Sequence, residues 1–316
     1  MIVAVTGGTG FIGRRLVERL VERGDVVRML TRQPIPPEKS PLVEICACDL
    51  LTTGVSDLAA ILQDVDVLYH CAGQLTDVCA MRSLHVDATR KLIEAASGLV
   101  GRWVQLSSVG VYGPASNGIV TEESALNPRG EYEVTKADAD VLIIEAAKMG
   151  RIRHSILRPS NVYGAGMSNR SLYSLIEMIR RGWFFFIGTP GASANYIHVD
   201  NVVEALLMCG TLPQAIGQVY NLSDRRTIEQ FVTVIAHLLG KETPRLRVPE
   251  KIIRPIARLL GSFPGVPLTE DRVDALTGRA IYSTEKTERE LGYMHRVSME
   301  EGLADLVGYW QKTEMR

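Results

Sequence analysis

Tyr132 and Lys136 stand four positions apart, a spacing that places both side chains on one face of a helix, one turn from each other. A phenol is a poor base at neutral pH, because lowering its pKa by about 3 units requires about 4 kcal/mol of preferential phenolate stabilisation. An adjacent ammonium in a partly dry cleft supplies much of that energy. Ser107 and Ser108 end an apolar run, where a hydroxyl would project from the carboxyl edge of a sheet. These residue types together indicate acid–base chemistry.

A glycine-rich loop, Thr6–Gly13, stands between a short apolar run and a segment with apolar residues at helical spacing. Gly7, Gly10 and Gly13 would make a tight turn, let the backbone approach a pyrophosphate, and pack the helix closely on the strand. The helix N-terminus adds free N–H groups and a partial positive charge. The loop therefore predicts a dinucleotide cofactor, held also by Thr9, Phe11 and Ile12.

The residue at the tip of the second expected strand selects the coenzyme. A carboxylate there would bind the ribose 2′-hydroxyl of NAD, but this chain has Thr31 followed by Arg32. Arg32 suits a 2′-phosphate, so the sequence favours NADP(H), with NAD as the second choice; the alternative is a solvated surface arginine. Asp49 and Leu50, after the third expected strand, would hold the adenine edge, or Asp49 caps the next helix.

The first half of the chain alternates between strand and helix patterns. Short apolar runs predict strands at 2–5, 26–30, 43–48, 65–71 and 103–107, and amphipathic segments predict helices at 11–23, 57–63, 79–97 and 132–149. Such alternation indicates an α/β protein with a Rossmann-type, doubly wound parallel sheet covered by helices on both faces.

After about residue 165 the alternation loosens, and five prolines between 244 and 267 divide the chain into short pieces. We therefore expect a dinucleotide-binding domain over residues 1–165, with 195–225 returning to its sheet. Residues 166–194 and 226–316 would form a smaller C-terminal substrate-binding lobe.

Composition excludes several classes of protein. The 316 residues are 46% hydrophobic and 22% charged, which excludes disorder, collagen and coiled coil. A net charge of −1 provides no field for nucleic acid. Five cysteines are too few for a disulfide framework and match no metal-ligand spacing, so no metal is expected and the thiols indicate a reducing compartment. Because no apolar run is long enough for a signal peptide or a membrane span, we expect a soluble, cytoplasmic protein.

Motifs along the whole chain agree with one family. They are the Thr6–Gly13 loop, Asp49-Leu50, His70–Gly73, Ser107–Gly113, Tyr132 with Lys136, Leu157–Gly164, Tyr196–Val202, Tyr220–Leu222, Tyr282–Lys286 and Glu290–Tyr293. With these the chain resembles the extended short-chain dehydrogenase/reductase family over essentially its full length. The resemblance implies an NAD(P)-dependent oxidoreductase or epimerase that transfers hydride at a secondary alcohol or ketone.

The resemblance also assigns roles to single residues. Tyr132 would be the catalytic acid/base, Lys136 would lower its pKa and hold the nicotinamide ribose, and Ser108 rather than Ser107 would bind the reacting oxygen. The cofactor would further contact Cys71, Ala72, Gly73, Pro159 and Ser160. Two histidines, His70 and His198, look structural. The family often has Val-Asn-x-x-Gly-Thr on the helix after the fourth strand, whereas this chain has Val86-Asp87-Ala88-Thr89, which argues against a water-relay role at position 87.

For the substrate, the pattern looks like the nucleotide-sugar epimerase/reductase branch. Sugar-nucleotide members often have an Arg two residues before the aromatic residue of the Tyr196 motif, but Ala194 stands there. Because a buried diphosphate needs cations, Arg272 and Arg279 are the expected substitutes, unless both are solvated helix residues. Further substrate contacts are expected from Ser108, Asn161 and Asn195.

Other classes of function stay open. In a 3β-hydroxysteroid or other lipid-alcohol dehydrogenase, Trp183–Ile187 would line an apolar wall, although the same run fits a core strand. A non-catalytic NADP(H)-binding sensor would keep the dinucleotide without turnover. The basic, amphipathic segment 251–260 fits a lid helix better than a membrane-surface element. In the family, the helices near 79–97 and 132–149 pair in dimers, so a homodimer is expected.

Overall fold

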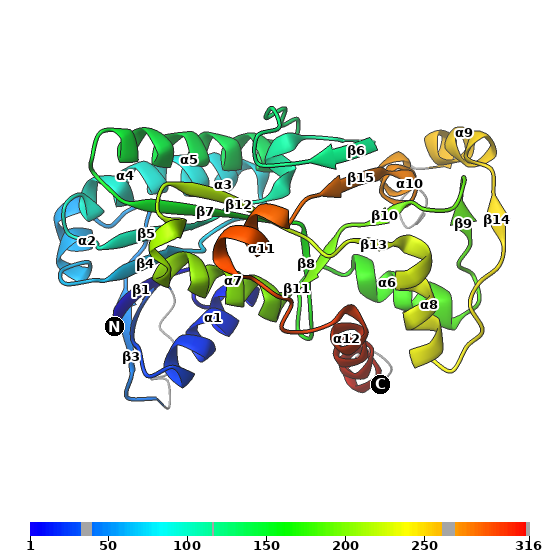
Figure 1. Cartoon of the computed structure of the whole chain (residues 1–316), viewed down its shortest axis with the longest axis horizontal. Coiled ribbons are helices and arrows are strands. Elements are labelled where there is room, and N and C mark those ends of the chain that lie inside the picture. The colour runs from blue at the N-terminus through cyan, green and yellow to red at the C-terminus, as the bar shows by residue number, and fades with distance from the viewer. Residues whose placement is uncertain (33–39, 116, 261–268, 314–316) are drawn as a thin grey trace.

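The computed structural model describes residues 1–32, 40–115, 117–260 and 269–313, and within them a seven-stranded parallel sheet forms the centre (Figure 1). From one edge to the other its strands are β12 (Gln218–Leu222), β7 (His154–Pro159), β5 (Arg102–Leu106), β4 (Val67–His70), β1 (Ile2–Thr6), β2 (Val26–Thr31) and β3 (Val43–Ala47). The chain order reverses between β1 and β4, which is where such sheets bind ligands. The expected α/β, doubly wound Rossmann-type fold is confirmed.

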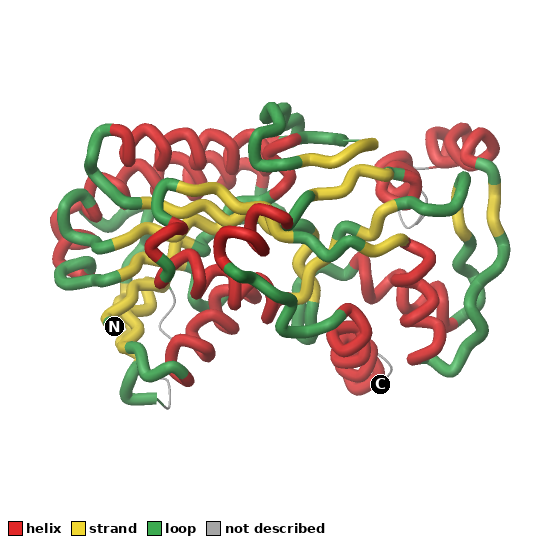
Figure 2. The backbone as a smooth tube through the Cα atoms, in the orientation of Figure 1, coloured by secondary structure: helices red, strands yellow, loops and turns green. Residues whose placement is uncertain are grey.

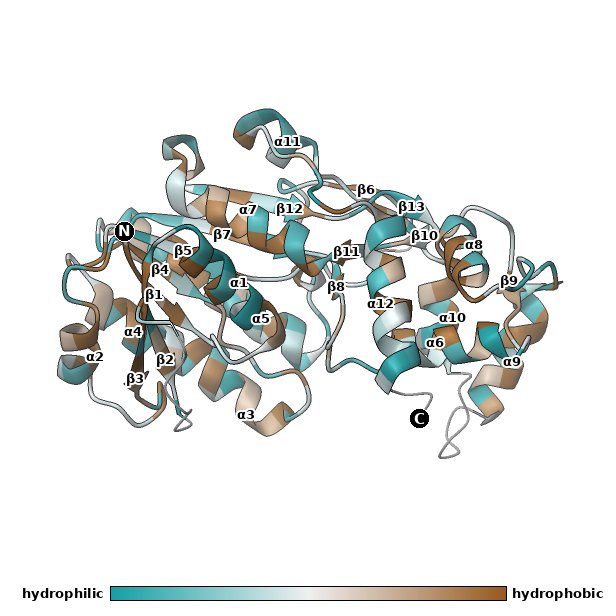
Figure 3. Ribbon diagram, turned by 90° about the horizontal axis from the view of Figure 1, so that it is seen from below, coloured by the Kyte–Doolittle hydropathy of each residue, from teal (hydrophilic) through white to brown (hydrophobic). Residues whose placement is uncertain are grey.

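Side chains of the sheet alternate between two cores. Val3 and Val5 face α1 (Phe11–Glu22) and α7 (Val199–Thr211). Ala4, between those valines, faces the other core. That second core contains residues of α2 (Val55–Ile61), α4 (Ala88–Ala96) and α5 (Glu131–Lys148). Figure 1 shows α1 and α7 on one side of the sheet and α2, α4 and α5 on the other, and Figure 3 shows β1–β4 as strongly hydrophobic. The alternation follows from the period of two along a strand.

The helix expected at 79–97 has an interruption that the sequence pattern did not show. It consists of α3 (Val78–Arg82), a π-helical turn at Ser83–Asp87, and α4. A π turn holds one residue more than an α turn, so it changes which side chains point inward; such turns are frequent at functional sites.

Past β7 the described chain is mostly helical, with short strand pairs between the helices (Figure 2). Besides α7, the α-helices of this part are α6 (Ser171–Arg180), α8 (Ile228–Leu238), α9 (Glu250–Leu260), α10 (Glu270–Thr277), α11 (Glu285–Leu291) and α12 (Met299–Thr313). The strand pairs are β8 (Asn161–Tyr163) with β11 (Tyr196–His198), β9 (Phe186–Ile187) with β14 (Arg247–Val248), β10 (Ser193–Ala194) with β13 (Arg226–Thr227), and β6 (Asn117–Val120) with β15 (Arg279–Tyr282). A separate core joins α6, α8 and α12. The domain boundaries expected from the sequence stay a prediction.

The described residues exclude three features. None of their helices has the length and apolarity to cross a membrane. They hold no cluster of three or more His, Cys, Asp or Glu that would bind a metal ion. The five cysteines, all in the described part of the chain, are free thiols.

Candidate active site

A cavity of about 400 Å³ opens at the carboxyl ends of β1, β4, β5 and β7. It brings together thirteen of the residues singled out in the sequence, namely Gly7, Gly10, Phe11, Ile12, Gly13, Cys71, Gly73, Ser108, Tyr132, Lys136, Pro159, Ser160 and Asn161. Nine further described residues also line it, namely Leu75, Leu106, Ser107, Val162, Met167, Ser168, Asn169, Leu172 and Tyr196. The cavity therefore contains both a candidate phosphate loop and a candidate acid/base group.

Two glycines of the loop, Gly7 and Gly13, have no room for a side chain. A Cβ at Gly13 would lie 2.1 Å from the carbonyl oxygen of Gly7, and one at Gly7, where φ is +68°, would lie 2.7 Å from the backbone nitrogen of Ala72. Within the described part of the chain no side chain caps the start of α1, so its first N–H groups are available to an anion. The loop fits the pyrophosphate of a dinucleotide.

Several expected cofactor contacts lie outside this lining, namely Thr9, Arg32, Asp49, Leu50 and Ala72. Arg32 is exposed just after β2, next to residues outside the described ranges. Asp49 accepts a hydrogen bond from the Leu51 N–H (2.9 Å). The alternative in which Asp49 caps α2 is wrong, because the cap of that helix is Gly54.

Tyr132 and Lys136 lie one turn apart on α5, beside Ser108 at the end of β5. Burial raises the pKa of the Tyr132 phenol above its ordinary value, and the neighbouring Ser108 side chain opposes that rise. Burial lowers the pKa of Lys136, against the opposing effect of Asp140. The Lys136 ammonium donates to the Leu106 carbonyl (3.0 Å). Desolvation thus favours the neutral form of both groups, and each charged form depends on its partners.

The two serines at the end of β5 have different surroundings. Ser107 is buried, and its hydroxyl donates to Asp140 Oδ2 (2.9 Å). The same oxygen is bound by Arg158 of β7 (3.0 Å). Ser108 is half-buried, accepts from the Gly110 N–H (3.1 Å) and contacts Tyr132. This geometry favours Ser108 over Ser107 as the residue that binds a substrate oxygen.

Two cavity residues bear on what binds there. Ser160 is buried and its hydroxyl has no hydrogen-bond partner among the described residues, so a polar group of a bound molecule would satisfy it. Burial raises the pKa of the Cys71 thiol to about 12, which makes that thiol a poor nucleophile.

The sequence interpretation missed His85. Position 87, which it considered instead, is an exposed aspartate paired with Arg90. His85, two residues earlier in the π turn, is buried beside Tyr132, with ring centroids 5.7 Å apart. The π turn explains why the sequence pattern did not indicate His85. Its extra residue changes which side chains face inward, so the spacing of a regular helix does not predict that His85 is buried here.

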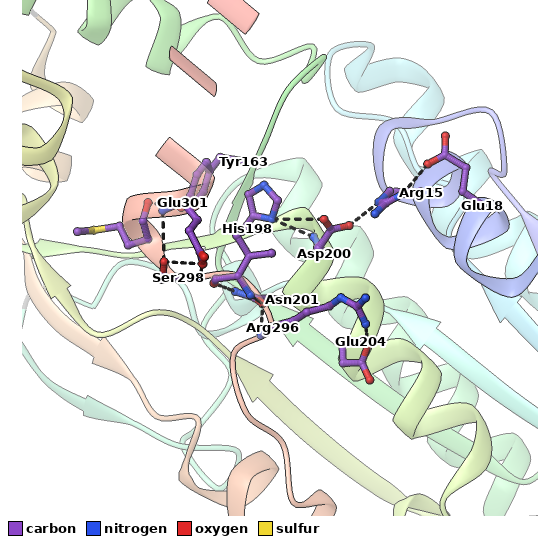
Figure 4. A network of polar contacts seen from close by, with 12 residues as sticks. Arg15, Glu18, Tyr163, His198, Asp200, Asn201, Glu204, Arg296, Ser298 and Glu301 are labelled. Atoms are coloured by element: carbon purple, nitrogen blue, oxygen red, sulfur yellow. Dashed lines mark hydrogen bonds and ion pairs between the residues drawn. The ribbon is translucent and has the colours of Figure 1, made fainter. Parts of the chain in front are cut away.

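His198 lies in a polar network that joins helices (Figure 4). Its Nδ1 accepts from the Asp200 N–H (3.3 Å), and the Asp200 carboxylate pairs with Arg15 of α1. Asn201 binds the backbone of Arg296 and Val297 ahead of α12. These contacts give His198 a structural place outside the cavity.

The residues proposed for the substrate are mostly engaged elsewhere. Asn161 lines the cavity. The Asn195 amide donates to the Ala280 carbonyl (3.0 Å). Arg279 donates to the carbonyls of Thr189 (3.0 Å) and Pro190 (2.7 Å). Arg272 is exposed on α10 and is not part of the lining.

The run Trp183–Ile187 does not line this cavity either. Trp183 is 64% exposed, and Phe184 and Phe186 belong to the core of α6, α8 and α12. The apolar wall of the cavity comes instead from Phe11, Leu75, Met167, Leu172 and Tyr196.

Comparison with known proteins gives one family. The model of the NAD dependent epimerase/dehydratase family matches residues 3–223. The UDP-glucose 4-epimerase of Vibrio cholerae is 26% identical over 317 positions, covering 95% of this chain and 92% of its own. A 4-hydroxy-2-methyl-3-oxo-4-farnesyl-3,4-dihydroquinoline-1-oxide ketoreductase of Stigmatella aurantiaca is 29% identical over 317 positions, covering 95% and 93%.

Among solved structures, the UDP-glucuronic acid 4-epimerase of Bacillus cereus in complex with NAD has a similar fold. The TM-score is 0.77 at 22% identity, covering 100% of this chain and 99% of that one.

Proposed function

The chain belongs to the NAD-dependent epimerase/dehydratase family, and from that premise we propose that it transfers hydride at a secondary alcohol or ketone, with Tyr132 as acid/base. The observation that carries this proposal is the meeting of Tyr132, Ser108 and Lys136 in one cavity with the glycine loop. A nicotinamide coenzyme supplies the hydride acceptor or donor when bound.

The residues of this chain handle the proton. In oxidation the substrate carbon loses a hydride, and its hydroxyl proton passes to the Tyr132 phenolate; reduction reverses both transfers. Ser108 donates to the reacting oxygen and holds it against the phenol. The Lys136 ammonium stabilises the phenolate, which offsets the burial that raises the pKa of Tyr132. Gly7 and Gly13, where no side chain would fit, support dinucleotide binding.

For the substrate we propose an uncharged, largely apolar alcohol or ketone. Among the described residues that line the cavity, Lys136 is the only lysine or arginine, and its role is toward the coenzyme and the phenol. Burying a diphosphate without a cation is costly, whereas Phe11, Met167 and Leu172 suit an apolar skeleton. The farnesylated substrate named for the Stigmatella relative supports this class.

A nucleotide sugar, which the sequence ranked first, is the second candidate. Asn161 at the cavity and the full-length likeness to a UDP-glucose 4-epimerase favour it. It would require Arg279 to leave the Thr189 and Pro190 carbonyls and face the cavity.

A turnover assay separates these candidates. The protein is incubated with NADP⁺ or NAD⁺ and either a 3β-hydroxysteroid or UDP-glucose. Oxidation is followed by reduced-coenzyme absorbance and by mass spectrometry, and epimerised sugar nucleotide, which has the same mass as UDP-glucose, is separated by chromatography. Steroid oxidation with an inert UDP-glucose is expected. Turnover of UDP-glucose alone would overturn the apolar class, and turnover in a Tyr132→Phe variant would overturn the acid/base assignment.

We also propose that the active form is a homodimer paired through α4 and α5. Val141 on α5 is 44% exposed, which supports an apolar contact on that helix. Light scattering after size-exclusion chromatography tests the assembly, and Val141→Glu is expected to yield monomers.

A further inference from the structure

His85 contacts two chain segments that border the cavity. It lies in the π turn at Ser83–Asp87 and is 2% exposed. One ring nitrogen, Nε2, accepts a hydrogen bond from the Gln74 backbone N–H (2.9 Å). The other, Nδ1, lies 2.8 Å from the Thr135 hydroxyl oxygen. The ring thus connects the end of the Cys71–Gln74 segment to the turn of α5 that carries Tyr132.

These partners determine the protonation of the ring. A backbone N–H only donates, so Nε2 must offer a lone pair and the proton of the neutral ring must be on Nδ1. Nδ1 then donates to Thr135 Oγ1, whose own hydroxyl donates to the Glu131 carbonyl (2.7 Å). A proton on Nε2 would point at the Gln74 N–H. Only the neutral, Nδ1-protonated form satisfies every contact.

The same ring lies between the reacting groups and the cofactor wall. It meets the Tyr132 ring edge to face, with planes at 81°. A Cβ placed on Gly73, which lines the cavity, would be 3.4 Å from His85 Nε2 and 3.5 Å from Lys136 Nζ. A charged imidazole there would repel Lys136, and burial together with Lys136 lowers the pKa of His85 to about 3. The neutral form is therefore kept across the physiological range.

We propose that His85 is a positioning residue, whose neutral, Nδ1-protonated ring fixes the Tyr132 turn of α5 against the Cys71–Gln74 wall of the cavity. This inference rests on the proposed function, since it acts through Tyr132. A displacement of about 1 Å between reacting groups can cost about 100-fold in rate. The contacts of His85 should therefore affect turnover more than binding of substrate or coenzyme.

The first experiment reads the ring itself and needs no substrate. In ¹⁵N-histidine-labelled protein, two-dimensional NMR distinguishes the two neutral tautomers and the cation, and the His85→Gln variant assigns the signal. A neutral Nδ1–H form that does not titrate between pH 5 and 8 is expected. An Nε2–H form, or titration in that range, would overturn the inference.

The second experiment uses different variants to remove the two hydrogen bonds of His85 separately. His85→Gln keeps an acceptor for the Gln74 N–H but loses the donor to Thr135, and His85→Asn keeps a donor near Thr135 but loses the reach to Gln74. Thr135→Val removes the shared hydroxyl, and Thr135→Ser retains it. Asp87→Asn, exposed in the same π turn, is the matched control.

Turnover is measured with the 3β-hydroxysteroid or UDP-glucose probe that reacts, and NADPH binding by fluorescence. We expect kcat to fall at least about 10-fold in both His85 variants and in Thr135→Val, with KM and coenzyme Kd within about 3-fold. Thr135→Ser and Asp87→Asn should retain kcat. Unchanged kcat in His85→Gln, His85→Asn and Thr135→Val would overturn the inference, as would a loss confined to coenzyme affinity.

Persistent activity in Tyr132→Phe would instead overturn the proposed function. The NMR result on the tautomer of His85 does not depend on that activity. If His85→Gln does not fold, Thr135→Val tests the same contact from α5.

Discussion

At the scale of single residues, Tyr132 is the group whose removal tests the proposed chemistry most directly. Tyr132→Phe deletes one oxygen and leaves the ring against His85. We expect turnover to fall by about two orders of magnitude or more, the range of general acid–base contributions, while NADPH affinity stays within about 3-fold. Tyr309→Phe, at an exposed tyrosine of α12, is the control. Retained cellular function in Tyr132→Phe would favour the sensor alternative.

The pH dependence of turnover follows from the direction of the Tyr132 pKa. Oxidation needs the phenolate, so its rate should rise with pH through the pKa of Tyr132, and reduction, which needs the phenol, should fall over the same interval. Burial raises this pKa. In the proposed mechanism the Lys136 ammonium stabilises the phenolate, so Lys136→Met should move the pH-dependent change in rate to higher pH. The measurement is kcat/KM against pH in both directions. If Tyr132→Phe keeps the same change of rate with pH, the group that titrates is another residue.

Arg32 carries the prediction about the coenzyme. A charge-assisted contact with a 2′-phosphate contributes about 1.5–3 kcal/mol, so Arg32→Ala should weaken NADP binding by about 10- to 150-fold and scarcely affect NAD. Isothermal titration gives both constants. Arg90→Ala, an exposed arginine on α4, should change neither. Tighter NAD than NADP in the unmodified protein would contradict the preference.

The sequence predicted the functional residues whose contacts lie within a few positions along the chain, and it missed those whose contacts come from distant segments. The spacing of Tyr132 and Lys136, and the glycines of the loop, are visible because helix and turn geometry fix them over a few residues. The partner of Lys136 is a backbone carbonyl at Leu106, which any residue type would offer. His85 depends on Gln74 and Thr135, contacts that leave no pattern in the sequence.

At the scale of elements, a buried ion pair joins α5 to the sheet. Asp140 and Arg158 are both buried, and Ser107 shares the carboxylate. Arg158→Met leaves Asp140 without its countercharge, so we expect a loss of about 3–5 kcal/mol in the free energy of unfolding. Because burial already raises the pKa of Asp140, the variant should protonate this carboxyl.

Urea denaturation measures this loss. Arg90→Met, which breaks an exposed pair with Asp87, should cost less than about 1 kcal/mol. Equal losses in the two variants would show that the Arg158 pair contributes no more than a surface contact.

Elements were predictable where hydrophobic period alone defines them. Strands such as β1, buried on both faces, and helix α5 agree with expectation within a residue or two. The helix at 79–97 was expected as one regular piece, because apolar spacing does not reveal where a π turn adds a residue. Trp183–Ile187 was expected to be a strand throughout, but only Phe186–Ile187 pairs, with β14, and such pairing depends on a partner about sixty residues away in the sequence.

At the scale of the whole molecule, the fold and the family followed from the sequence, but the substrate side of the cavity did not. That wall combines Leu75, Met167, Leu172 and Tyr196 from separate segments. Their convergence depends on how α6 and β11 pack beside the sheet, which no single motif encodes. The sequence could rank Arg279 as a phosphate ligand, whereas the packed chain directs that side chain to Thr189 and Pro190.

The charge of this wall gives the last prediction. With Lys136 as the one cation among the described lining residues, UDP has no countercharge on the substrate side and should not inhibit turnover of a 3β-hydroxysteroid at millimolar concentration. Arg279→Ala should then leave the steroid KM within about 2-fold, since its contacts are to the backbone at 189–190. A nucleotide-sugar enzyme gives the opposite result, because inhibition by UDP depends on that arginine and is lost in Arg279→Ala. Inhibition assays at fixed coenzyme distinguish the two, and UDP inhibition that disappears with Arg279 would show that the arginine turns toward the cavity when a diphosphate binds.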